Sequence, residues 1–225
     1  MARGLAVFDI DGTLTATNEV DDECFLRAVR DVLSLDVAPD WSDAPHVTDS
    51  ALAPWICEQY GGRSLRDGEV ATILGRFIGH LEVALAQEPQ RFAPIAGASD
   101  VFARLRTHGW DSAMATGGWD ESARLKLRAV GIDPDKIPLA TSSDAHTRIE
   151  ILHLAVQRAA TSHTRIVSIG DGVWDLDAAR TLGWPFIGIG TGARAERLRE
   201  AGARVVIPDL RDTAGLVQAL ETTSS

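Results

Sequence analysis

The sequence predicts an α/β fold with a doubly wound, mostly parallel, Rossmann-like sheet and an inserted all-helical cap domain. From about residue 98 onward, short apolar runs alternate with amphipathic segments, which is the pattern of a parallel sheet covered by helices on both faces. The apolar run at residues 5–8 precedes this alternation, and the residues between them show only helical periodicity. We therefore expect a core of residues 1–14 and 93–225, with a cap of residues 15–92.

Three segments account for the cap. Residues 20–35 and 50–60 have helical apolar spacing, and residues 70–85 carry the clearest amphipathic stripe of the chain. That stripe consists of Val70, Ile73, Leu74, Phe77, Ile78, Leu81 and Leu85. Prolines and a glycine within residues 87–97 indicate a linker back to the core.

The core elements follow in alternation. The expected strands are residues 5–8, 112–116, 137–141, 165–170, 185–190 and 204–207, and the expected helices are residues 101–106, 121–130, 149–160 and 175–182. Four apolar residues in a row at 5–8 leave the strand without a polar face toward solvent, so this strand is expected to be fully buried.

Composition limits the possible partners. The 225 residues are 45% hydrophobic and 24% charged, as in a soluble globular protein, and the net charge of −10 argues against a nucleic-acid-binding groove. No apolar stretch approaches the roughly 20 residues that a membrane span needs. Cys24 and Cys57 have no metal-ligand spacing, which favours reduced thiols. With no signal peptide at the start, we expect a cytoplasmic monomer or small homo-oligomer that binds neither membrane nor nucleic acid.

The most informative feature is the run Asp9-Ile10-Asp11-Gly12-Thr13 at the end of the first strand. Side chains at strand ends project into the crevice where open α/β sheets bind ligands, and Asp9 and Asp11, two residues apart, share a face of an extended segment. Carboxylates held so close repel each other unless a cation or a shared proton relieves them. A divalent metal with a phosphorylated substrate would do so, whereas the alternative is an ordinary acidic turn.

Two later strand ends carry further candidates. Thr116-Gly117-Gly118 offers a hydroxyl and free backbone N–H groups to an anion, although a turn that needs glycine would have the same sequence. Asp171 and Asp175 lie four residues apart at the expected start of a helix. Helix capping would account for one of these aspartates but less well for two. Together with Asp9 and Asp11 they would make an oxygen-rich cage suited to Mg²⁺.

A cation is the remaining part of such a site. Arg148 stands where a strand has ended and a helix begins, so it is the first choice for contacting a phosphate. Lys126 is the second choice, because it lies well inside a helix between Arg124 and Arg128 and is expected to be a solvated surface charge.

Together, these segments resemble the haloacid dehalogenase-like hydrolase superfamily. The matching motifs are residues 9–13, residues 115–118 and residues 170–175, in the order that the family has them. The family's third motif, between the second and the last of these, is a basic residue, for which Arg148 or Lys126 is the candidate. The helical insertion between the first and second of these motifs resembles the family's C1-type cap. The family usually has lysine, often before proline, in the third motif, whereas Arg148 is followed by Ile149.

The resemblance implies a mechanism. Asp9 would attack phosphorus and become an aspartyl-phosphate, and Asp11 would protonate the leaving oxygen and later activate water. The Asp9 carboxylate, the Asp11 carbonyl and Asp171 would hold one Mg²⁺, and Asp175 would brace them. Thr116 and the glycines at 117 and 118 would bind the phosphoryl oxygens, with Arg148 or Lys126 neutralising charge.

The resemblance also implies the reaction class and its alternatives. Asp11 favours phosphoryl chemistry over dehalogenation, and the absence of lysine from residues 14–97 argues against the phosphonate-cleaving branch. The expected function is hydrolysis of a small phosphorylated metabolite, with Asn18 placed to touch its non-reacting end. A phosphosugar mutase remains an alternative. A receiver-type signalling domain is a further one, although the cap segment counts against it. Trp119 and Trp174 are expected to be packing residues more than pocket walls.

Overall fold

In the computed structural model, which describes residues 4–159 and 163–223, six strands form one parallel sheet. These are β1 (Gly4–Phe8), β2 (Trp110–Ala115), β3 (Leu139–Ala140), β4 (Ile166–Gly170), β5 (Phe186–Ile189) and β6 (Val205–Ile207). Their order, β3-β2-β1-β4-β5-β6, is that of the Rossmann type, so the predicted fold class is confirmed. The chain leaves β1 first toward β2 and β3 and later returns to β4, which places the topological switch point beside β1.

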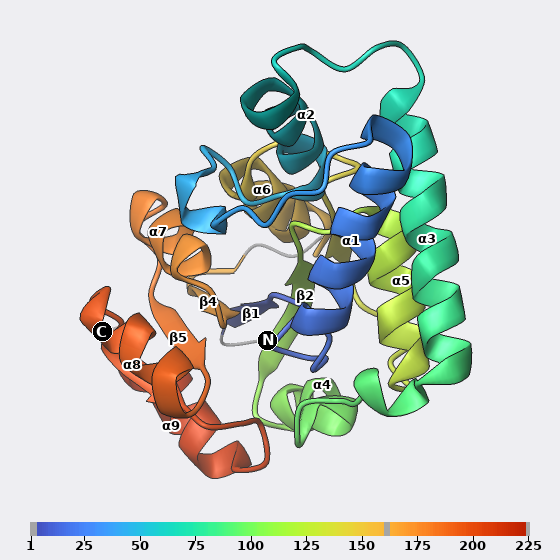
Figure 1. The fold of residues 1–225 in the computed structure, drawn as a ribbon. Coiled ribbons are helices and arrows are strands. Elements are labelled where there is room, and N and C mark those ends of the chain that lie inside the picture. The colour runs from blue at the N-terminus through green and yellow to red at the C-terminus, as the bar shows by residue number, and fades with distance from the viewer. Residues whose placement is uncertain (1–3, 160–162, 224–225) are drawn as a thin grey trace.

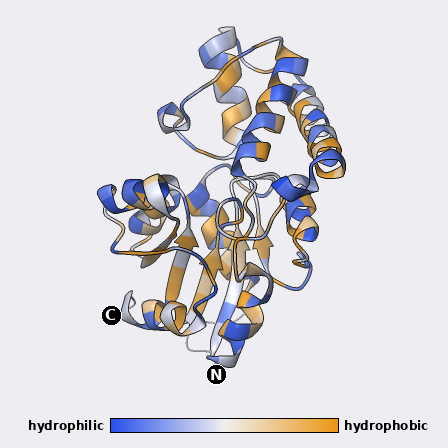
Figure 2. Ribbon diagram, turned by 60° about the horizontal axis from the view of Figure 1, so that its bottom comes forward, coloured by the Kyte–Doolittle hydropathy of each residue, from blue (hydrophilic) through white to orange (hydrophobic). Residues whose placement is uncertain are grey.

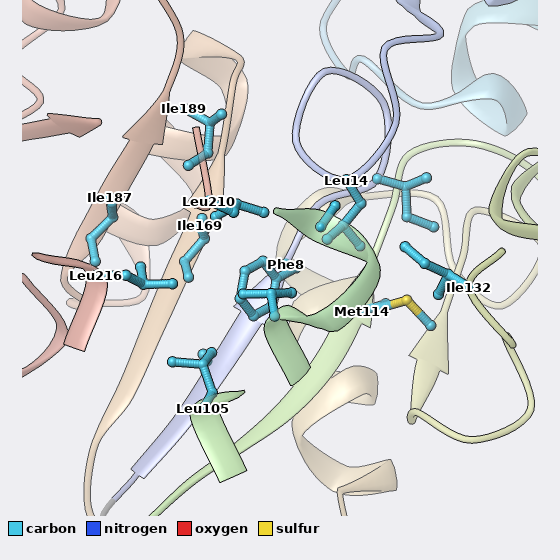
Figure 3. Packing of buried hydrophobic residues seen from close by; sticks show 14 of the residues in the cluster. Phe8, Leu14, Leu105, Met114, Ile132, Ile169, Ile187, Ile189, Leu210 and Leu216 are labelled. Carbon is cyan, nitrogen blue, oxygen red and sulfur yellow. The ribbon is translucent and has the colours of Figure 1, made fainter. Parts of the chain in front are cut away.

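Helices cover both faces of the sheet (Figure 1). The core helices are α4 (Ala98–Thr107), α5 (Asp120–Ala129), α6 (Arg148–Arg158), α7 (Val173–Thr181), α8 (Gly192–Glu200) and α9 (Thr213–Thr223). Because successive side chains of a strand point to opposite faces, Phe8 packs with Leu105 and Leu216, whereas Val7 packs with Ile151 on the other face. Figure 3 shows Phe8 at the centre of the first of these two clusters.

The elements between β1 and α4 are helical, as predicted. They are α1 (Asn18–Leu33), α2 (Asp49–Gly61), α3 (Glu69–Gln87) and two short 3₁₀ turns, Trp41–Asp43 and Pro89–Arg91. Figure 2 shows this group beyond the arrowheads of the sheet strands, and it has an apolar cluster of its own. In that cluster the rings of Phe25 and Phe77 pack edge to face, with their centroids 5.7 Å apart.

Trp119, in the loop after β2, joins the helical group to the core. Its ring centroid lies 5.8 Å from that of Phe25 and 6.1 Å from that of Phe77, and its side chain is buried. The interpretation of Trp119 as a packing residue is therefore confirmed. The apolar stripe of α3 is also confirmed at Ile73 and Phe77, which are fully buried, but Val70 is 40% exposed.

The structure differs from the predicted element list in three places. Helices α8 and α9 follow β5 and β6, where the sequence analysis predicts no helix. Helix α8 is mostly charged and buries only Ala195 and Leu198, so it has no apolar stripe. Strand β3 is shorter than predicted, since only Leu139 and Ala140 pair with β2.

No helix among the described residues has both the length and the apolar character that crossing a bilayer requires.

Candidate functional site

The candidate site lies at the carboxyl ends of β1, β2 and β4. Phe8 of β1 is level with Met114 of β2 and Ile169 of β4. The residues that follow these strands, Asp9 and Asp171 in particular, therefore emerge at one edge of the sheet. The backbone N–H of Asp9 donates to the carbonyl of Ile169 at 2.9 Å, which fixes the start of this loop. The strand ends thus converge as the sequence predicted.

Three of the four predicted aspartates form one buried cluster. Asp9, Asp171 and Asp175 each have a carboxylate oxygen within 4.8 Å of the others, and their exposed fractions are only 6%, 7% and 5%. The side chain of Asp11 is not part of this group. Its carboxylate turns instead toward α1 and α5.

Local backbone geometry explains how Asp171 reaches the first loop. Gly12 has a φ of +76°, and a Cβ at this position would lie 2.0 Å from Oδ2 of Asp171. Only glycine therefore allows the loop to approach this carboxylate. Asn18, the first residue of α1, donates its side-chain N–H to the same Oδ2 at 3.2 Å. Asn18 is thus placed at the acidic cluster.

Asp175 serves two purposes at once. It is the third residue of α7, and its Oδ2 accepts the backbone N–H of Gly172 at 3.0 Å, as in a capping box. Its other oxygen, Oδ1, faces the guanidinium of Arg148. The capping interpretation is correct for Asp175, but it does not exclude a place in the site.

Arg148 is the cation that contacts Asp9 and Asp175 of the acidic cluster. It is the first residue of α6, and its Nη1 lies 3.1 Å from Oδ1 of Asp9 and 2.5 Å from Oδ1 of Asp175. Its Nε donates to the carbonyl of Val47 at 3.2 Å, so the same side chain joins the core to the loop before α2. The guanidinium also lies over the ring of Trp174, 5.8 Å from its centroid.

The charges of this cluster do not balance. Burial, together with the like charge of Asp175, raises the pKa of Asp9 well above its usual range, although Arg148 opposes the shift. Burial and Asp175 likewise raise the pKa of Asp171 to about 7, although Arg194 lies 3.1 Å away. Carboxylates destabilised in this way are relieved by further positive charge.

The donor set fits a divalent cation. Three buried carboxylate oxygens within 4.8 Å of one another are hard ligands of the kind that Mg²⁺ prefers. Burial and the like charges of the cluster together outweigh the attraction of Arg148 and Arg194, so the pKa values of Asp9 and Asp171 are raised.

Thr116 lies beside the cluster. Its side chain is 2% exposed, its Oγ1 accepts the backbone N–H of Gly118 at 3.1 Å, and it lines a small cavity together with Asp9 and Arg148. A Cβ on Gly117 would lie 2.9 Å from Nη2 of Arg148, so this position too requires close approach. The second predicted segment is therefore in contact with the site.

Lys126 corrects the sequence interpretation, which expected a surface charge. Its side chain is fully buried, and its Nζ lies 2.6 Å from Oδ2 of Asp11 and 2.5 Å from Oδ1 of Asp21. A signal for this was available, because Ala123 and Leu127 place the apolar face of α5 on the same side as Lys126.

Three polar residues near the site were missed. Asp21 binds Lys126, Arg194 pairs with Asp171, and Asp49 accepts the backbone N–H of Trp119 at 2.9 Å. Asp49 also donates its own N–H to the carbonyl of Gly117 at 2.8 Å. The start of α2 is thereby hydrogen-bonded to the Thr116 loop.

A larger cavity of about 890 Å³ opens beside the cluster. It is lined by Asp171, Trp174 and Arg194 of the core and by Trp41 and His46 from the segment before α2. Trp174 is thus a wall of this cavity as well as a partner of Arg148, contrary to its interpretation as a packing residue. The cavity is large enough for a small organic molecule.

Comparisons with known proteins identify the family and the fold. A family model described as haloacid dehalogenase-like hydrolase matches residues 4–183. The phosphoglycolate phosphatase of Mesorhizobium japonicum is 24% identical over 212 residues, which cover 92% of this chain and 91% of that protein. The tyrosine-protein kinase PtkA of Mycobacterium tuberculosis is 25% identical over 221 residues, covering 94% of this chain and 72% of that protein. The crystal structure of a hydrolase from Pseudomonas syringae superposes with a TM-score of 0.77 at 22% identity, covering 99% of this chain and all of that one.

Proposed function

The chain belongs to the haloacid dehalogenase-like hydrolases, and we propose that it is a Mg²⁺-dependent phosphatase acting on a small phosphorylated metabolite through an aspartyl-phosphate intermediate. The observation that carries this proposal is the contact of Arg148 with Asp9 inside the buried Asp9, Asp171 and Asp175 cluster. In this proposal Asp9 is the nucleophile, Asp9 and Asp171 would hold the cation, and Asp175 would brace them.

In the first step, a carboxylate oxygen of Asp9 attacks phosphorus and the ester P–O bond breaks. Asp11 donates a proton to the departing ester oxygen, which leaves as an alcohol. Arg148 and the Thr116 loop hold the phosphoryl oxygens, and most of the rate acceleration comes from this positioning and charge stabilisation.

In the second step, water attacks phosphorus, Asp11 takes a proton from it, and the bond to Asp9 breaks to release inorganic phosphate. The carboxylates of Asp9 and Asp171 and the backbone carbonyl of Asp11 would hold Mg²⁺, with Asp175 as a brace. When bound, the ion supplies positive charge that the arginines alone do not. Asp9 returns to its free carboxylate at the end of the cycle.

The cavity beside the cluster supports a small organic substrate. It adjoins Asp171 and Arg148 and includes Asn18, so the alcohol part of a phosphate ester bound at Asp9 would extend into it. The helices of residues 15–92 would form the cap over this cavity, and their closure would exclude water from the reaction. The relative named phosphoglycolate phosphatase is consistent with this substrate class.

The test is phosphate release from a panel of phosphate monoesters, with and without Mg²⁺, by the wild type and by Asp9→Asn. We expect turnover that needs Mg²⁺ and disappears in Asp9→Asn, while Asp135→Asn, at an exposed surface aspartate, retains it. Hydrolysis that survives Asp9→Asn would remove Asp9 from its proposed role.

The same panel separates the phosphatase from the phosphosugar mutase that the resemblance also allows. A mutase would need a bisphosphate primer and would move a phosphoryl group between sugar hydroxyls without net release of phosphate. Family membership itself argues against the receiver-type signalling domain, because the matching model describes hydrolases.

A further inference from the structure

Lys126 is a buried cation that the proposed mechanism does not need at the phosphate. Its side chain is fully buried on α5, and its Nζ contacts Asp11 and Asp21 at 2.6 and 2.5 Å. Removing an ammonium group from water is costly unless carboxylates compensate it closely. The complete burial of Lys126 therefore depends on its two carboxylate partners, Asp11 and Asp21.

Elements from both parts of the chain surround this lysine. Asp21 lies in the first turn of α1, Asp49 at the start of α2, and Asp11 in the loop after β1. Burial alone lowers the pKa of Lys126, but the attraction of these three carboxylates outweighs it, and the pKa is raised overall. The side chain is therefore a permanent positive charge.

Lys126 acts on Asp11 and not on Asp9. Among the described residues, Nζ of Lys126 donates to Asp11 and Asp21 and makes no hydrogen bond to Asp9. Arg148 is the cation in contact with Asp9. Lys126 binds Oδ2 of Asp11, while the other oxygen, Oδ1, accepts the hydroxyl of Thr17 at 2.5 Å.

We propose that Lys126, anchored by Asp21, is a positioning residue that fixes the direction of the Asp11 carboxylate for proton transfer to the leaving oxygen. This inference rests on the proposed function, in which Asp11 gives a proton in the first step and takes one in the second. Asp21 gives Lys126 a second carboxylate, so the lysine stays paired while Asp11 carries the proton. The helix α1 is thereby linked to the proton-transfer group.

Dependence on the leaving group tests this role. A 4-nitrophenolate leaves without help from an acid, whereas an alkoxide needs a proton as the P–O bond breaks. We expect Lys126→Met to lower kcat/KM about 10²-fold for the alkyl phosphate hydrolysed fastest in the panel, and less than about threefold for 4-nitrophenyl phosphate. Asp11→Asn should show the same selectivity. Arg128→Met, on the same helix but 60% exposed, should leave both values unchanged.

Two further variants keep the test decisive. Lys126→Met leaves carboxylates buried without their cation, so Lys126→Met/Asp21→Asn removes one of those charges while still freeing Asp11. Lys126→Arg keeps the charge and should restore much of the rate with the alkyl ester. If the folded double variant lowers kcat/KM for the two esters by the same factor, or if Lys126→Arg is as selective as Lys126→Met, the proposal is wrong.

The proposed function and this inference fail in different ways. Turnover of both esters by Asp9→Asn would contradict the aspartyl-phosphate mechanism itself. Loss of both activities in Asp9→Asn, together with leaving-group selectivity in Asp11→Asn but none in the Lys126 variants, would contradict only the role of Lys126. Circular dichroism and thermal unfolding of each variant establish that the folded proteins are being compared.

Discussion

Nη1 of Arg148 lies 3.1 Å from Oδ1 of Asp9, and this pair joins the first residue of α6 to the loop after β1. Arg148 also contacts Asp175 and the carbonyl of Val47, which a planar group with several donors can do and an ammonium group cannot do as well. We predict that Arg148→Met lowers kcat/KM about 10²- to 10³-fold, because a fixed positive charge at the reacting group is lost.

Arg148→Lys should have a higher kcat/KM than Arg148→Met, because lysine restores the positive charge but not all the contacts of arginine. Steady-state kinetics on the best substrate of the panel measures both effects. Arg211→Met, at an arginine that is 75% exposed, provides the control. An Arg148→Met enzyme with normal kcat/KM would show that Asp9 does not need this partner.

Metal binding should be visible without any substrate. If Mg²⁺ binds the Asp9, Asp171 and Asp175 cluster of the folded protein only, a concentration about 100-fold above its Kd stabilises by about 2.7 kcal/mol and raises Tm by about 5–10 °C. Chelation with EDTA should reverse the shift. Differential scanning fluorimetry measures it.

Substitution at Asp171 separates this effect from general ionic stabilisation. Asp171→Asn removes a buried carboxylate whose pKa burial raises to about 7, so the metal-free variant should unfold at a higher temperature than metal-free wild type. It should also lose most of the Mg²⁺-induced shift. A variant that keeps the full shift would place the ion elsewhere.

Site residues that directly follow a strand in the chain are the ones that the sequence predicts best. Asp9, Thr116 and Asp171 each directly follow a strand, so a parallel sheet brings them to one edge however the rest of the chain packs. Arg148 could be proposed in the same way, from its place at the start of a helix. The fold class followed from the alternation of strands and helices.

Contacts between segments far apart in the sequence were not predictable in this way. Lys126 meets Asp11 across 115 residues and Asp21 across 105, and both contacts depend on how α1 and α5 pack. Between two arginines, Lys126 had the local surroundings of a surface residue. Helix α8 was missed for a related reason, because only two of its side chains are buried.

Gly12 provides a further prediction, since both its backbone angle and its surroundings exclude a side chain. Gly12→Ala would place a Cβ 2.0 Å from Oδ2 of Asp171, so we expect loss of the Mg²⁺-induced Tm shift and of activity. Gly131 is the matched control, because its φ of +77° differs by only one degree but nothing lies within 4 Å of its Cβ position. Gly131→Ala should cost only about 1–2 kcal/mol of stability and leave the site intact. Equal effects of the two substitutions would mean that backbone strain alone is responsible.

The burial of Asp49 makes stability depend on pH. Burial raises the pKa of Asp49 to about 7, although the charge of Lys126 and the N–H of Trp119 oppose the shift. An unfolded aspartate has a pKa of about 3.9, so this carboxyl binds more protons in the folded than in the unfolded state between these two values. The stability that Asp49 contributes is therefore highest below pH 4 and falls as the pH rises to about 7.

Asp49→Asn imitates the protonated side chain and keeps an acceptor for the N–H of Trp119. We expect the variant to gain stability relative to wild type as the pH is raised, so that its unfolding free energy exceeds that of wild type at pH 8 by more than at pH 5. Urea unfolding followed by tryptophan fluorescence at the two pH values measures this difference. Asp36→Asn, where the side chain is 86% exposed, should track the wild type at both. If Asp49→Asn is instead the less stable protein at pH 8, then the ionised carboxylate is needed as a counter-charge for Lys126, and its attraction to that lysine outweighs the cost of burial.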